Sequence, residues 1–213
     1  MRNRNILPAK ILAIVAVSVA VIVLFGWIFN IPFLLSISPS WPTMKFISAL
    51  CFLLSGFMLY ALAIKQERSS AGADLTVQLS VILIFLLVVP IFISSIFDVR
   101  LNLENFLVKE AESAMTPVPG RPSIGTITAF FFIVLIGIFD WFSASRGIFW
   151  SGVVVGAIGA MASSGYILNF SQLYHFFGGV SAGMALHTSL LFIFLGIGYC
   201  LISFKNELSK VSS

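Results

Sequence analysis

Six long apolar runs, separated by short polar segments, constrain this chain more than any other feature of its sequence. They lie at about residues 11–29, 44–64, 75–97, 124–143, 147–169 and 183–204. Each run is close to the roughly 20 apolar residues that an α-helix needs to cross the hydrocarbon core of a bilayer. The runs therefore predict an all-α integral membrane protein with about six transmembrane helices.

The composition leaves little chain outside the membrane. Of the 213 residues, 59% are hydrophobic and 9% are charged, whereas soluble proteins carry about 25% charged residues. We therefore expect residues 1–213 to form a single membrane domain, with a short cytoplasmic tail at 205–213. The first run is longer than the core of a signal peptide, which is about 7–15 residues, so we interpret it as an uncleaved helix.

The basic residues predict how the helices are oriented. Six spans place both termini on one side of the membrane, and most Lys and Arg residues share that side. The terminal side carries Arg2, Arg4, Lys10, Lys65, Arg68, Arg146, Lys205 and Lys210, and the opposite side carries Lys45, Arg100, Lys109 and Arg121. Because basic loops stay in the cytoplasm, we expect a multi-pass protein of the cell membrane with cytoplasmic N- and C-termini.

The same basic residues are scattered around helix ends. A nucleic-acid-binding protein gathers them into a patch or stripe, so we expect no nucleic-acid partner. The expected surroundings are the lipid bilayer together with a membrane-protein partner or further copies of the chain.

Three stretches of the sequence align without gaps over nine positions. Each begins an even-numbered predicted helix and contains a hydroxyl residue, a small residue and then phenylalanine three positions on. Gly56 and Gly196 also match, whereas the second copy has Ile136 there and Gly137 one position later. The aligned stretches are Met44–Phe52, Ile124–Phe132 and Met184–Phe192.

Because one odd-numbered helix precedes each copy, the repeating unit is a helical hairpin. The three hairpins cover about residues 11–64, 75–143 and 147–204, and all run through the membrane in the same direction. Three parallel hairpins predict an architecture with pseudo-threefold symmetry. They differ from the inverted repeats of many transporters, which makes a transporter of small solutes or lipids a minor alternative.

The aligned hydroxyl residues Ser48, Thr128 and Thr188 have two interpretations. Small and hydroxylated side chains let helices approach closely and bond to neighbouring backbone. Alternatively, these residues converge to line a shallow ligand cavity at the outer face. Three further residues belong to that candidate cavity, namely His187, Met44 and Met184.

Two histidines are weak candidates for binding a metal. His187 lies about one turn inside the last predicted span and His175 lies in the loop before it. Imidazole nitrogens bind haem iron or copper, but no further ligands are evident in the sequence. We therefore predict no cofactor and interpret His187 as a hydrogen-bonded structural residue, with haem or copper as the minor alternative.

Charged residues near the helix ends and small residues within one span have structural interpretations. Asp98 with Arg100, and Asp140 with Arg146, form candidate ion pairs at the membrane interfaces. The fifth span carries a small residue at every fourth position, which predicts a face for close helix packing. That face comprises Gly152, Gly156, Ala160 and Ser164.

The repeated stretches, together with Pro119-Gly120-Arg121 and Gly183-Met184-Ala185-Leu186-His187-Thr188, resemble a family of membrane regions. These are the multi-helix input regions found ahead of PAS, histidine-kinase or diguanylate-cyclase modules in bacterial signalling proteins. The resemblance covers nearly the whole chain and implies a sensor of a stimulus. The family carries a cytoplasmic output domain, and residues 205–213 are too few for one, so signalling through a partner is expected.

No GxSxG, HExxH, P-loop or CxxC motif occurs in the chain, so we expect no enzymatic activity. The leading hypothesis is a non-enzymatic sensory or receptor-like membrane module that acts through a partner. The alternative is a structural accessory subunit of a multi-subunit membrane enzyme or electron-transfer complex.

Overall fold

The computed structural model describes residues 6–38, 40–97, 120–175 and 183–211. Six long helices run through these residues, each long and apolar enough to cross a membrane, and the chain is therefore a multi-pass membrane protein. Two short helices, α2 (Pro32–Leu35) and α7 (Gln172–His175), follow the first and fifth of them. The long helices are α1 (Ile6–Ile28), α3 (Phe46–Lys65), α4 (Ala71–Phe97), α5 (Ile124–Trp141), α6 (Ser145–Ile167) and α8 (Leu186–Val211).

Two helices extend well beyond the apolar runs. α1 begins at Ile6 and accommodates Pro8 in its first turn, where the missing N–H of proline costs no helical hydrogen bond. α8 continues to Val211, past the expected end at residue 204. Lys205 and Glu207 are good helix formers, and a helix needs an apolar sequence only while it lies in lipid.

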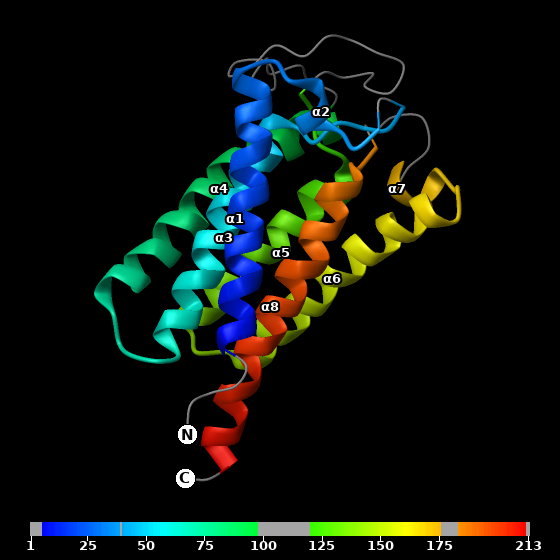
Figure 1. The fold of residues 1–213 in the computed structure, drawn as a ribbon. Coiled ribbons are helices and arrows are strands. Elements are labelled where there is room, and N and C mark those ends of the chain that lie inside the picture. Colours follow the sequence, from blue (N-terminus) through cyan, green and yellow to red (C-terminus); the bar gives the residue numbers. More distant parts are fainter. Residues whose placement is uncertain (1–5, 39, 98–119, 176–182, 212–213) are drawn as a thin grey trace.

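The six long helices form three hairpins, α1 with α3, α4 with α5, and α6 with α8. Each hairpin also contacts the next through α3 with α4, α5 with α6, and α8 with α1, so the helices close into a ring. α3, α5 and α8 also contact one another and so lie nearest the centre. Figure 1 shows α1 beginning and α8 ending at the same end of the bundle, here named the terminal end, with α2 and α7 at the opposite loop end.

Three phenylalanine rings meet where the central helices come together, and are named here the aromatic triad: Phe52, Phe130 and Phe192. Their ring centroids are 4.9 Å apart for Phe52 and Phe130, 4.7 Å for Phe52 and Phe192, and 5.1 Å for Phe130 and Phe192. Each side chain is buried. Tilted and edge-to-face contacts at these separations are favourable for aromatic pairs, so the triad joins all three hairpins.

The triad corrects the expected alignment of the second copy. The sequence pairs Phe132 with Phe52 and Phe192, but the structure places Phe130 in the triad and leaves Phe132 half-buried. The physical reason is the start of α5, where the Ser123 side chain accepts a hydrogen bond from the Thr126 N–H at 3.2 Å and caps the helix. With α5 beginning at Ile124, Phe130 stands as far into its helix as Phe52 and Phe192 do in theirs.

Glycines bring α6 and α8 into backbone contact. A Cβ on Gly196 would lie 2.6 Å from the backbone nitrogen of Gly156 and 2.7 Å from the carbonyl oxygen of Gly152. Such a short distance leaves no space for any side chain at this crossing. Gly56 is placed similarly on α3, where its Cβ would lie 3.0 Å from the Ala13 carbonyl oxygen of α1.

The small-residue face of α6 departs from the predicted spacing after Gly156. Ala160 is exposed and Ser164 bonds within its own helix to the Met161 carbonyl. The contact with α8 continues instead through Gly159, and through Ser163, which bonds to Ser189 at 2.8 Å. An α-helix has 3.6 residues per turn, so positions spaced by four drift around the helix and leave the interface.

We predict that Phe130→Ala destabilises the protein more than Phe132→Ala does. Removing a ring from the triad leaves a cavity that costs about 3 kcal/mol, whereas Phe132 is only half-buried. Unfolding of the purified protein by SDS titration in mixed micelles measures both changes. Equal losses, or a greater loss for Phe132→Ala, would contradict the observed register.

A second pair of substitutions tests the glycine crossing. Gly196→Ala is expected to cost roughly 1–3 kcal/mol, because the added methyl group forces two backbones apart. The matched control is Gly72→Ala in α4, where the nearest atom to a new Cβ is 3.9 Å away and alanine favours the helix by roughly 0.5–1 kcal/mol. The SDS midpoint should fall for the first variant only, and a fall in both would refute the explanation.

Candidate functional site

A layer of hydroxyl residues lies one helical turn from the aromatic triad, toward the loop end. Ser48, Thr126 and Thr188 each precede a triad phenylalanine by four residues, which places them on the same helix faces. All three are 2% exposed, so this hydroxyl layer is closed to solvent. Thr126 takes the place that the sequence analysis assigned to Thr128, which is half-buried.

Met44 and Met184 contribute through their backbone groups. Both side chains are buried. The Met44 carbonyl accepts a hydrogen bond from the Trp27 indole N–H at 2.9 Å, and the Met184 carbonyl accepts one from the Tyr166 hydroxyl at 2.6 Å. These two bonds tie the chain just before α3 and α8 to the ends of α1 and α6.

The two tethers belong to a second repeated segment, which the sequence analysis missed. Residues 26–35 and 165–174 align without gaps and share Gly, Ile, Asn and Leu at four positions. Asn30 and Asn169 both have φ of 53°, the left-handed conformation that ends many helices. The Gly26 carbonyl bonds to the Ile31 N–H, and the Gly165 carbonyl to the Phe170 N–H, both at 2.8 Å. The shared Gly-aromatic-Ile-x-Asn pattern could have revealed this segment.

Aromatic rings connect the loops of the first and third hairpins. Trp41 precedes α3 and its ring lies 4.9 Å from that of Tyr166, which in turn stacks on Tyr174 at 4.3 Å. His175 lies 5.0 Å from Tyr174 at the end of α7. The predicted site residue His175 is therefore part of an aromatic contact at the loop end.

His187 lies in the first turn of α8, beside the hydroxyl layer in sequence. Its Nε2 atom is buried and has no hydrogen-bond partner among the described residues, which leaves the expected hydrogen-bonded role without support at that atom. Within the described part of the chain, no group of three or more His, Cys, Asp or Glu residues could hold a metal ion. The structure therefore adds no third ligand to the two histidines.

Two cations are buried where the central helices begin. Lys45 is 3% exposed and Arg121 is 5% exposed. Lys45 donates to the Thr43 hydroxyl at 3.2 Å, and Arg121 donates to the Ser94 hydroxyl at 2.9 Å. From the sequence alone, both residues were expected only as loop charges. Their burial makes them part of the packed loop end, where Arg121 connects α4 to the start of α5.

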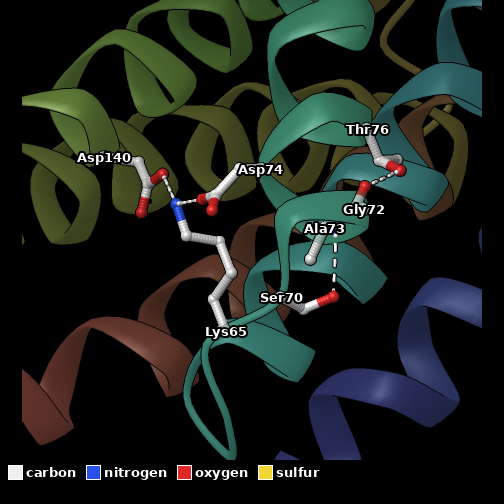
Figure 2. A network of polar contacts seen from close by, with 7 residues as sticks. All are labelled: Lys65, Ser70, Gly72, Ala73, Asp74, Thr76 and Asp140. Carbon is white, nitrogen blue, oxygen red and sulfur yellow. Dashed lines mark hydrogen bonds and ion pairs between the residues drawn. The ribbon is translucent and has the colours of Figure 1, made fainter.

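An ion cluster joins three helices at the terminal end. Figure 2 shows the Lys65 ammonium between two carboxylates, at 2.8 Å from Asp74 and 2.5 Å from Asp140. The side chain of Asp140 is 16% exposed and that of Asp74 is 50% exposed. Lys65 ends α3, Asp74 lies in the first turn of α4, and Asp140 lies in the last turn of α5. The cluster therefore links the first hairpin to the second.

The structure bears on one residue of the predicted ion pairs, Asp140. Asp140 binds Lys65, a partner from another hairpin that the sequence analysis did not name. Its pairing with Arg146 stays a prediction. Asp98 and Arg100 lie outside the described residues.

Comparisons with protein-family models, with curated proteins and with solved structures found no match to this chain. The features that bear on function are therefore those of the structure itself. They are a closed hydroxyl layer next to an aromatic triad, tethers around that layer at the loop end, and an ion cluster at the terminal end.

The ion cluster predicts unequal effects of two neutral substitutions. Asp140→Asn removes the better-buried partner of Lys65 and is expected to cost about 1–2 kcal/mol. Asp74→Asn removes the more exposed partner and should cost less than about 1 kcal/mol. The same SDS unfolding assay ranks the two variants, and a greater loss for Asp74→Asn would show that Asp140 is not the principal partner.

Proposed function

We propose that this protein is a non-enzymatic sensory module, in which a stimulus at the loop end alters helix packing and thereby a partner at the terminal end. The observation that carries the proposal is the continuity of α8. This one helix begins beside the hydroxyl layer, contributes Phe192 to the aromatic triad and runs on to Val211. Figure 1 shows it projecting beyond the rest of the bundle.

A continuous helix is a suitable element for transmitting a change. A helix moves largely as a rigid body, and packed interfaces tend to adopt discrete arrangements. Phe192 contacts both other triad rings, so a shift of α8 requires the triad to repack. A ligand alters the equilibrium between two arrangements only if it binds one of them more tightly, and the hydroxyl layer lies one turn from the triad.

We assign the stimulus site to the loop end, where a contact would act on the buried hydroxyl layer of Ser48, Thr126 and Thr188 through the starts of their helices. The tethers through Trp27 and Tyr166 hold the starts of α3 and α8, so contacts there act directly on helix position. The resemblance to bacterial sensory input regions supports the same role. The excess of Lys and Arg on the terminal side supports cytoplasmic termini, which places α8 where a cytoplasmic partner could bind it.

Purification without crosslinking tests whether the chain works as a sensor. We expect a signalling protein such as a kinase or cyclase to co-elute with the full chain from native membranes. Stoichiometric co-elution with a membrane oxidoreductase would overturn the proposal in favour of an accessory subunit. A reporter fused after Ser213 should be active in the cytoplasm, and extracytoplasmic activity would overturn the orientation.

The coupling through α8 has its own test. Phe192→Ala should change the output of the co-purified partner while leaving the partner bound, because it alters the triad and not the terminal end. Phe194→Ala is the matched control, since Phe194 lies on the same helix but is half-buried and outside the triad. An unchanged output for Phe192→Ala, or an equal change for both variants, would contradict transmission through the triad.

A further inference from the structure

A groove opens between α1 and α3 on the outside of the bundle, in the half nearer the terminal end. Its volume is about 230 Å³, and apart from one phenol hydroxyl its lining is apolar. The floor includes Ala13, which is completely buried, whereas Ile14, Phe57 and Tyr60 on the sides are exposed. The lining residues are Ala13, Ile14, Val17, Phe57 and Tyr60. Because the exposed apolar surface of a spanning helix faces lipid, this groove opens into the bilayer.

The terminal edge of the groove carries opposite charges. The Lys10 ammonium lies 5.9 Å from the centre of the Tyr60 ring and 2.6 Å from the Glu67 carboxylate. Lys10 stands one turn before Ala13 on α1, so the ion pair marks the end of the groove that faces the membrane surface. Tyrosine is enriched at this depth in membranes, and lysine extends its ammonium toward the headgroups.

The third hairpin lacks this arrangement at the corresponding place. There Gly152 and Gly156 stand where α1 has Ala13 and Val17, and they bring the backbone of Gly196 against α6. The residue corresponding to Lys10 is Phe149. At these positions the third hairpin therefore has neither a side chain that matches Val17 nor a cation that matches Lys10.

We infer that this groove binds one phospholipid with an ethanolamine headgroup, from the leaflet at the terminal end. An acyl chain fills the apolar groove. The lipid phosphate accepts a hydrogen bond from Lys10, whose ammonium has three donors, and the ethanolamine ammonium donates to the Glu67 carboxylate. A paired cation and anion on the protein thus match a paired anion and cation on the lipid. Lipid binding at this groove does not require the sensory role proposed above.

The charges of Lys10 and Glu67 distinguish among the common phospholipid headgroups. A choline headgroup has no N–H to donate to Glu67. A glycerol headgroup has no cation to pair with that carboxylate, so the negative charge of the lipid phosphate stays uncompensated beside it. We therefore expect the delipidated full chain, titrated in native mass spectrometry with lipids of identical acyl chains, to bind phosphatidylethanolamine first. Equal binding of the ethanolamine, choline and glycerol lipids, or a preference for the glycerol lipid, would overturn the inference.

Three variants separate the groove from its charged edge. Glu67→Gln should narrow the preference for ethanolamine over choline by roughly two- to fivefold, in keeping with an exposed ion pair. Ile14→Trp should cover the groove and reduce retention of all three lipids. Val153→Trp, at the corresponding exposed position of α6, is the control and should retain lipid normally. An equal loss of bound lipid in both tryptophan variants would refute a lipid occupant. So would a dimer of the wild-type protein that Ile14→Trp dissociates.

Discussion

The contact among Phe52, Phe130 and Phe192 is the interaction on which the rest of the structure depends. Within a bilayer, burying apolar surface provides little drive for helices to associate, because lipid is as apolar as the side chains. Shape complementarity and polar contacts must then hold the bundle together. The triad supplies the first at the centre, where α3, α5 and α8 each contribute one ring. The outer helices α1, α4 and α6 pack around that centre, each beside its hairpin partner.

The two ends of the bundle are held by different chemistry. At the loop end, the hydrogen bonds from Trp27 and Tyr166 fix the chain before α3 and α8, and Arg121 is buried against Ser94. At the terminal end, Lys65 joins three helices through exposed or half-buried carboxylates. The described residues are thus held mainly by hydrogen bonds at the loop end and by ion pairs at the terminal end.

The sequence predicted two of the three residues in the hydroxyl layer but neither the third residue nor the tethers. The hydroxyl residues Ser48 and Thr188 were identified from their repeated position, and both are in the layer. Thr126 was missed because the pattern of a hydroxyl residue, a small residue and a later phenylalanine fits better at Thr128, where Ala129 follows, than at Thr126, where Ile127 follows. The tethers were missed because Trp27 and Tyr166 differ in residue type, although the Gly and Asn around them are shared.

The sequence by itself determined the number of spans, and an even number of spans places α1 and α8 with their outer ends at the same end of the bundle. It could do so because backbone groups in lipid must bond within their own helix, so that an apolar run of sufficient length has one stable conformation. Tertiary structure alone decided which faces of those helices meet. Ala160 lies outside the α6–α8 interface because positions spaced by four drift around a helix. The N-cap at Ser123 sets the register of α5. Asp140 of the second hairpin pairs with Lys65 of the first. The drift and the N-cap are local, but which helix faces they bring together, like the pairing of Lys65 with Asp140, depends on contacts between segments far apart in the chain.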